Sequence, residues 1–322
     1  MSELLRYVAD ELRAPVAEAV AQVSDAIRAR HGDATVATLF YGSCLRRDTL
    51  EGVLDFFVLV SSYREAYRSG RLRWLNRAAP PNVFQLEVAT GHGALRTKYA
   101  VISIAHFERA ARFRHLHPHV WGRFAQPAAL VWARDETTRS RIASAVAVAT
   151  STAVRRGLAL ARPERRRGRE LELTAAGLWQ TIFARSYATE LRTEAPATIR
   201  AVFDAAPERY RRVTALALAR LERRGTIAGF EQHDDRIVVR HRAFHRSLDR
   251  LGWLIRLPLA KAAAAIRLLK GIATFDGWLG YVLWKLERHT GVRISPTARQ
   301  RRHPLIFGWP LLFQVLKRGN LR

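Results

Sequence analysis

Ser43 and Asp55 are the two residues of this sequence whose types and spacing could do chemistry together. They lie in the run LFYGSCLRRDTLEGVLDFFVLV, which spans 39–60. Apolar segments rich in β-branched and aromatic residues flank a Gly-Ser pair, which predicts a strand, a tight turn, a short helix and a second strand. Asp55 would lie inside the second strand. An unpaired carboxylate there costs several kcal/mol, so we expect a cation or a dense set of hydrogen bonds to face it.

This order of elements is typical of the nucleotidyltransferase fold. Small residues at the turn, Gly42 and Ser43, allow backbone amides and a hydroxyl to approach triphosphate oxygens, and the strand carboxylate can hold magnesium against the same phosphates. That fold usually has two carboxylates spaced by two on the second strand, so that both point to one face. Here the same-face neighbours of Asp55 are Val53 and Phe57. From these residues alone, a buried, hydrogen-bonded Asp in an ordinary α/β core is the competing interpretation.

A second carboxylate could come from the segment SYATELRTE, 186–194, which contains Glu190 and Glu194. Acids are outnumbered in this chain by about two to one, 28 against 54 basic residues, so a pair of them stands out. On a helix the two glutamates would share a face. The alternative, which the residues leave open, is solvent-exposed pairing with arginines.

The charge of the chain predicts an anionic partner. The formal net charge of +26 fits nucleic acid, an acidic membrane surface or a polyphosphate substrate. Basic residues are concentrated after residue 240, where 16 of them face three acids. The single cysteine, Cys44, excludes an intramolecular disulfide and a cysteine-rich zinc site. The charged N-terminal segment does not resemble a signal peptide, and no uncharged run is long enough to span a membrane, so we expect a cytoplasmic protein.

The order of predicted elements indicates an α/β (α+β) protein in three parts. Helices over 2–31, a hairpin of 82–88 and 95–103, and a long helix over 135–162 belong to a nucleotidyltransferase-fold catalytic domain, 1–162. The basic segment PERRRGR, 163–169, is expected to be a solvated linker. Helices and then a short hairpin over 226–241 predict a helical, winged-helix-like domain, 170–250. The rest, 251–322, is a basic amphipathic region expected to associate with membranes.

Six blocks of the sequence, in order, resemble the mitochondrial-type phosphatidate cytidylyltransferases, the translocator-assembly-and-maintenance family. The resemblance spans 39 to about 290. This chain departs from the family pattern at Glu190, where the family typically has Asp, and in VSSYREAY, which lacks the family's polar Asp and His positions. The blocks are YGS at 41–43, VLDFFVLV at 53–60, LRTKYAVIS at 95–103, WGRFAQP at 121–127, SYATELR at 186–192 and LLKGIATFDGWLGYVLWKLER at 268–288.

The resemblance implies a peripheral, magnesium-dependent CDP-diacylglycerol synthase, which converts CTP and phosphatidate to CDP-diacylglycerol and pyrophosphate. Asp55 and Glu190 would hold the metal, and with Ser43 they would form the catalytic set. Tyr41, Gly42 and Ser43 would cradle the departing phosphates. The partners are then CTP, phosphatidate and the anionic inner face of the cell membrane. No nucleic acid is expected, and a homo-oligomer is left open.

Three basic residues are candidates for phosphate binding. Lys98 stands out because lysine is so scarce in this chain, and its ammonium would serve as a point charge on a phosphate. Snorkelling from a strand face is the alternative for this side chain. Arg123 and Arg192 are further candidates, each of which could equally be a plain surface arginine.

Three alternating histidines, His115, His117 and His119, suggest a metal site at first sight. With no nearby acid or cysteine and with Pro118 between them, a structural role is favoured.

Two other classes of function compete with the lipid enzyme. A nucleic-acid nucleotidyltransferase or template-independent polymerase is favoured by charge and by the winged-helix-like part. A non-catalytic pseudo-transferase that binds membranes or partners is favoured by Phe57 in place of a second carboxylate. A different cytidylylated acceptor, such as another phospholipid or a polyprenyl phosphate, is a third alternative.

Overall fold

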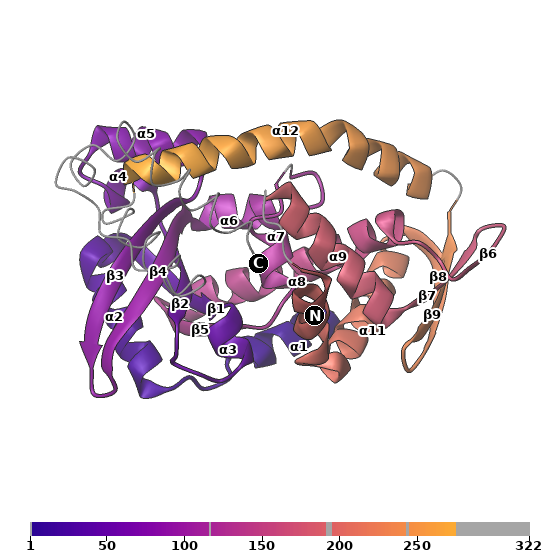
Figure 1. The fold of residues 1–322 in the computed structure, drawn as a ribbon, viewed down its shortest axis with the longest axis horizontal. Coiled ribbons are helices and arrows are strands. Elements are labelled where there is room, and N and C mark those ends of the chain that lie inside the picture. Colours follow the sequence, from indigo (N-terminus) through magenta and orange to yellow (C-terminus); the bar gives the residue numbers. More distant parts are fainter. Residues whose placement is uncertain (1, 116, 191–194, 243–244, 275–322) are drawn as a thin grey trace, which may run out of the picture.

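The computed structural model describes residues 2–115, 117–190, 195–242 and 245–274, and within them the chain is a mixed α/β protein with two sheets (Figure 1). The predicted N-terminal helices are confirmed as α1, Glu3–Leu12, and α2, Glu18–His31. Ser2 caps α1 by accepting a hydrogen bond from the backbone N–H of Leu5, as serine commonly does at this position. A short 3-10 turn, Gly32–Ala34, leads into the first sheet.

The first sheet contains the predicted strand pair and the predicted hairpin. Its order is β3-β4-β2-β1-β5, and only the β2–β4 pair is parallel among the strands described. The four-residue helix α3, Ser43–Arg46, connects β1 to β2, as expected from the Gly-Ser turn. The strands are β1, Thr35–Tyr41; β2, Val53–Val60; β3, Asn82–Thr90; β4, Gly93–Ser103; and β5, Ala128–Ala133.

The two faces of this sheet are covered by different helices. Because side chains alternate along a strand, Phe56 and Val58 of β2 pack with α2 on one face, while Phe57 and Leu59 pack on the other. Asp55 is on the Phe57 face. The remaining helices around this sheet are α4, Tyr63–Ala66; α5, Gly70–Ala78; α6, Ile104–Ala111; α7, Trp121–Phe124; and α8, Glu136–Leu160.

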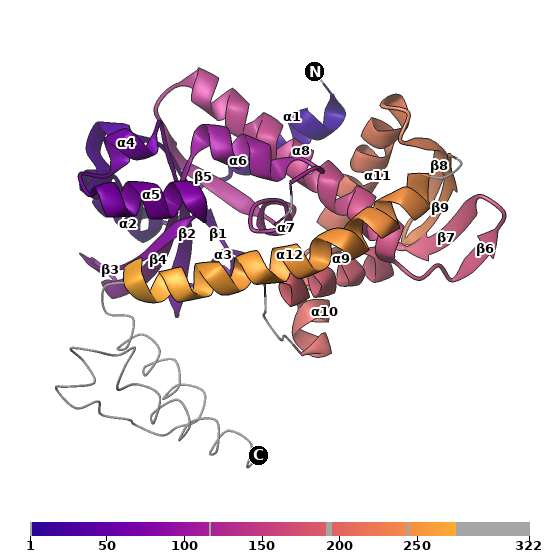
Figure 2. The same ribbon diagram turned by 90° about the horizontal axis from the view of Figure 1, so that it is seen from above.

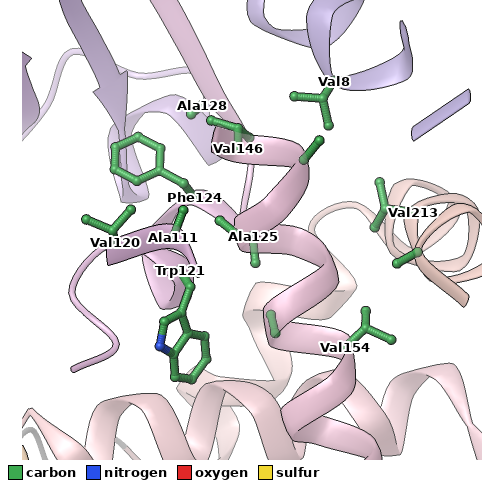
Figure 3. Packing of buried hydrophobic residues seen from close by; sticks show 14 of the residues in the cluster. Val8, Ala111, Val120, Trp121, Phe124, Ala125, Ala128, Val146, Val154 and Val213 are labelled. Carbon is green, nitrogen blue, oxygen red and sulfur yellow. The ribbon is translucent and has the colours of Figure 1, made fainter. Parts of the chain in front are cut away.

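Helix α8 is the centre of the buried core. Figure 3 shows side chains of the α7 segment on one side of α8 and side chains of α1 and of α11, Pro207–Arg223, on the other. Small residues, Ala, Gly, Ser and Thr, occupy most of its buried positions, which lets neighbouring helices approach closely. One hydrophobic cluster therefore extends from Leu4 through α8 to Val239 and Trp253, across the predicted boundary at 163–169.

The segment predicted as a solvated linker is instead part of a second sheet, so that prediction is wrong. Arg165–Arg167 forms β6 and Glu170–Thr174 forms β7, joined by a turn at Gly168 with φ +56. The register places Arg165 opposite Glu172, so an exposed edge strand keeps its charges solvated while its backbone pairs. Charge alone did not distinguish these two outcomes.

The second sheet has the order β6-β7-β9-β8 and is antiparallel. The predicted hairpin is confirmed as β8, Ile227–His233, and β9, Arg236–His241. Residues 170–174, expected to be helical, are β7. The helices between are α9, Ala175–Thr189; α10, Pro196–Asp204; and α11, Pro207–Arg223. A winged-helix relationship for this part stays a prediction.

Helix α12, His245–Thr274, is the longest helix described and runs from the second sheet to the first (Figures 1 and 2). Near its start, Asp249 accepts two hydrogen bonds of 2.7 Å from Arg155 of α8. Near its end, Lys270 donates to the carbonyl oxygens of Ala79 and Pro81, which precede β3. The predicted membrane-associating region therefore begins in a helix that packs on α8, α9 and strand β3, while its part from 275 to 322 lies outside the described residues.

Candidate active site

The turn after β1 brings the predicted glycine and carboxylate together. Gly42 has φ +97, a backbone conformation that residues with a side chain rarely adopt. A Cβ at this position would lie 2.8 Å from Oδ2 of Asp55. Tyr41 is opposite Asp55 in the antiparallel register, and Ser43 begins α3. Glycine is therefore required at 42 both by the backbone and by the close approach of the carboxylate.

A cation faces Asp55, as expected for a carboxylate inside a strand. Lys98 is its neighbour in the parallel β2–β4 register, and Nζ of Lys98 lies 3.2 Å from Oδ1 of Asp55. The two side chains are 36% and 23% exposed, so both groups can still be reached from solvent. Lys98 thus points to the catalytic candidate and does not simply snorkel away from the sheet.

Arg123 of α7 and Glu190 at the C-terminal end of α9 form a second ion pair. Both guanidinium Nη atoms of Arg123 donate to the carboxylate, one of them over 2.8 Å. Burial lowers the pKa of Arg123, but the adjacent Glu190 carboxylate outweighs this effect and leaves that pKa raised. Glu190 therefore pairs with an arginine, as the alternative interpretation held, but in a position only 9% exposed.

Lys98 of the first pair and both members of the second line one cavity of about 270 Å³, formed between the Asp55 face of the sheet and α12. Lys98, Arg123 and Glu190, predicted from three distant segments, all line it. Tyr41 lines it too, whereas Gly42, Ser43 and Asp55 do not belong to the part of its wall that is described, and Asp55 is connected to it through its pair with Lys98. The full lining is Tyr41, Phe57, Pro81, Val83, Lys98, Ala100, His117, His119, Arg123, Glu190, Ala264, Arg267 and Lys270.

Two cations of this cavity come from α12 and were not predicted. Arg267 and Lys270 share the inner face of the helix with Ala264, at the three-residue spacing of helical neighbours. Burial lowers the pKa of Lys270 to about 7 and that of Arg267 to about 10, and in Lys270 the charge of Arg267 adds to the effect. The scarcity of lysine, which pointed to Lys98, would also have pointed to Lys270.

A group of four histidine rings adjoins the cavity. Ring centroids of neighbouring members lie 5.3–6.3 Å apart. Burial lowers the pKa of His106 to about 4, that of His117 to about 2, and that of His119 well below the usual value. These rings are therefore neutral at pH 7. Across the described residues, no three or more His, Cys, Asp or Glu side chains are grouped to hold a metal ion.

Magnesium fits Asp55 better than it fits Glu190. The Asp55 carboxylate lies against a turn that only glycine can occupy, is partly exposed, and would share the ion with substrate phosphates, as magnesium sites commonly do. Both oxygens of Glu190 accept from Arg123, so an ion there would have to replace that partner. The predicted residues Arg192 and Glu194 lie outside the described residues.

Comparisons with known proteins add no family to this picture: no family model matches the chain, and no curated protein matches it. None of the helices in the described ranges combines the length and apolar character needed to cross a membrane.

Proposed function

We propose that this protein is a nucleotidyltransferase that transfers the CMP group of CTP to phosphatidate, giving CDP-diacylglycerol and pyrophosphate. The observation that carries the proposal is the position of Lys98, which lines the cavity together with Arg267 and Lys270 of α12 and pairs with Asp55 beside the glycine-requiring turn. Such a site suits a reaction between two phosphates, in which positioning and charge neutralisation do most of the work. It also agrees with a nucleotidyltransferase fold for the first sheet and its helices.

The outer face of α12 favours a lipid acceptor over a soluble one. Six aliphatic side chains of this helix are each more than half exposed, an arrangement that suits an interfacial helix. The inner face of the same helix supplies Arg267 and Lys270 to the cavity. A phosphate group in the cavity would therefore lie next to a surface that acyl chains can contact. The six are Leu248, Leu251, Leu254, Ile255, Leu259 and Ile266.

In the proposed reaction an oxygen of the phosphatidate phosphate attacks the α-phosphorus of CTP. A new P–O bond forms, the bond to the bridging oxygen breaks, and pyrophosphate leaves with that electron pair. Asp55 would hold magnesium, which supplies neutralisation of phosphate charge. Lys98 and Arg123 bind and orient the anionic groups, and Glu190 fixes the guanidinium plane of Arg123.

The decisive experiment supplies CTP radiolabelled at its α-phosphate, magnesium and either phosphatidate vesicles or tRNA. We expect label in organic-extractable lipid. Label found only in RNA would support the competing nucleic-acid nucleotidyltransferase, which is favoured by the basic surface of the second sheet. Absence of label from both products would favour a non-catalytic pseudo-transferase. If a polyprenyl phosphate, tested in the same way, is labelled instead of phosphatidate, then the acceptor is a polyprenyl phosphate.

A further inference from the structure

Backbone hydrogen bonds among His115, His117 and His119 fix the position of the proton on one buried histidine. The backbone N–H of His119 donates to Nδ1 of His117 over 3.2 Å, and the N–H of His117 donates in the same way to Nδ1 of His115 over 3.3 Å. A neutral imidazole whose Nδ1 accepts a hydrogen bond carries its proton on Nε2. His117 is therefore a hydrogen-bond donor at Nε2, held in that tautomer by the backbone.

This donor has no partner within the part of the chain that the structure describes. His117 is only 3% exposed and lines the cavity, yet its Nε2 makes no hydrogen bond there. Nη2 of Arg267, across the cavity on α12, is in the same situation. Both ring nitrogens of His119, in the same wall, are also unpartnered among the described residues. A buried polar group left unpaired costs about 1–3 kcal/mol, so this wall calls for a ligand. Nε2 of His117 and Nη2 of Arg267 are covered by neighbouring side chains, so a ligand reaching them displaces one of these.

The chemistry of the wall selects an anion with several acceptor oxygens. His117 Nε2–H and Arg267 can only donate, and Lys98, Arg123 and Lys270 bring further positive charge. Glu190 is the one acid of the described lining, and Arg123 already uses both of its oxygens. A phosphomonoester, with three terminal oxygens and up to two negative charges, matches this set of donors better than a carboxylate with two oxygens.

We propose that His117 and Arg267 form a phosphate-binding subsite that holds the phosphomonoester of the acceptor, separate from the turn at Gly42 and Ser43 that faces the nucleotide. Assigning the monoester to the acceptor rests on the proposed function; the existence of a phosphate subsite does not. Both residues are positioning residues for the acceptor phosphate. Neither accepts a proton in the reaction, since His117 donates from a neutral ring.

The test measures binding to the full-length protein by isothermal titration calorimetry, with glycerol 3-phosphate and CTP as separate ligands. His117→Asn keeps an acceptor near the Nδ1 position for the His119 N–H but loses the donor at Nε2. His117→Gln places an amide donor near the Nε2 position. For glycerol 3-phosphate we expect about tenfold weaker binding in His117→Asn, as for one hydrogen bond to a charged group, and a change of less than about threefold in His117→Gln. CTP binding should stay unchanged in both.

Arg267→Gln is the second variant, because Arg267 lies outside the hydrophobic core and its loss should not affect folding. We expect at least tenfold weaker binding of glycerol 3-phosphate. The proposal is wrong if wild type does not bind this ligand at millimolar concentration, if the variants weaken CTP instead, or if His117→Asn and His117→Gln behave alike. Because the experiment measures binding, it can detect a phosphate subsite even where no lipid product forms. If His117→Asn leaves lipid synthesis unchanged, the proposed subsite is wrong, but the proposed enzymatic function is not.

Discussion

Four basic side chains line the cavity, Lys98, Arg123, Arg267 and Lys270, and five arginines surround a surface hollow of about 390 Å³ at the opposite end of α12. We call the second group the arginine patch: Arg166, Arg169, Arg242, Arg246 and Arg250. In the cavity, carboxylates pair with two of the cations, and of the cations of α12 Lys270 is buried and Arg267 is partly buried. No acid belongs to the described wall of the hollow.

The cavity and the arginine patch therefore use positive charge in two different ways, which the net charge of +26 does not distinguish. Buried, paired cations hold a ligand in a defined geometry, because their own positions are fixed. Exposed arginines attract any polyanion, and salt screens that attraction over about 10 Å at 0.1 M. We therefore expect changes in the cavity to alter chemistry and changes in the patch to alter only salt-dependent association.

The largest effect is expected for Asp55→Asn. Loss of the carboxylate removes the candidate metal ligand and leaves Lys98 without its ion-pair partner, so the rate of lipid labelling should fall by about 1000-fold, or roughly 4 kcal/mol. Asp25→Asn, in an exposed ion pair on α2, is the matched control and should keep full activity. An active Asp55→Asn would show that this carboxylate does not hold the metal.

Glu190→Gln should mainly reduce stability, because it removes the carboxylate with which the partly buried guanidinium of Arg123 is paired. We expect the free energy of unfolding to fall by about 3 kcal/mol, measured by urea denaturation. Glu231→Gln removes an acid from the exposed pair with Arg240 and should change it by less than about 0.5 kcal/mol. Equal effects of the two substitutions would mean that burial does not distinguish these pairs.

The effect of Gly42→Ala should be smaller than that of Glu190→Gln, and it should include a loss of activity. The added Cβ meets the Asp55 carboxylate and the backbone adopts φ +97, which together should cost about 2 kcal/mol in stability and lower activity further by displacing the carboxylate. Gly91→Ala, in the β3–β4 turn with no atom near the new Cβ, is the control. If both variants unfold at the same temperature as wild type, the close approach at Gly42 does not constrain the site.

The neutral histidines predict loss of stability in acid. Burial lowers the pKa of His106 to about 4 and that of His117 to about 2, so between pH 6.5 and these values the unfolded chain binds more protons than the folded one. The free energy of unfolding should therefore fall as pH drops below 6.5, by about 1.4 kcal/mol per pH unit for each such histidine. Urea unfolding at pH 7 and pH 5 measures this, and equal values would contradict it.

Arg250→Gln, in the arginine patch, should have the smallest effect. Binding to vesicles containing anionic lipid should weaken about fivefold at low salt, near 1 kcal/mol per arginine, and the difference should vanish at high salt. Arg30→Gln on α2, which packs on the sheet face away from the cavity, is the control. A change in the labelling rate with a soluble short-chain substrate would overturn the distinction between patch and cavity.

Local patterns were sufficient to predict four of the five strands of the first sheet, and β5 was not predicted. Alternation and β-branched residues mark β1, β2 and the β3–β4 hairpin, and the Gly-Ser pair marks the turn, because each of these depends on neighbours in sequence. The cations of the cavity were predicted only in part. Arg267 and Lys270 lie about 170 residues from Lys98, and the direction in which α12 crosses the molecule, which no local pattern encodes, brings them together. The exposed edge strand β6 was missed because its arginines are as well solvated in a strand as in a linker.

Helix α12 is fastened near both ends, by Asp249 to Arg155 and by Lys270 to the carbonyl oxygens of Ala79 and Pro81. A helix turns about its axis as a unit, so any rotation that hid its outer leucines would also withdraw Arg267 from the cavity. Within the described residues, rotation of α12 therefore cannot bury its exposed apolar side chains without also removing Arg267 from the cavity. We therefore expect the purified protein with an intact cavity to aggregate in buffer alone and to stay monodisperse in mild detergent.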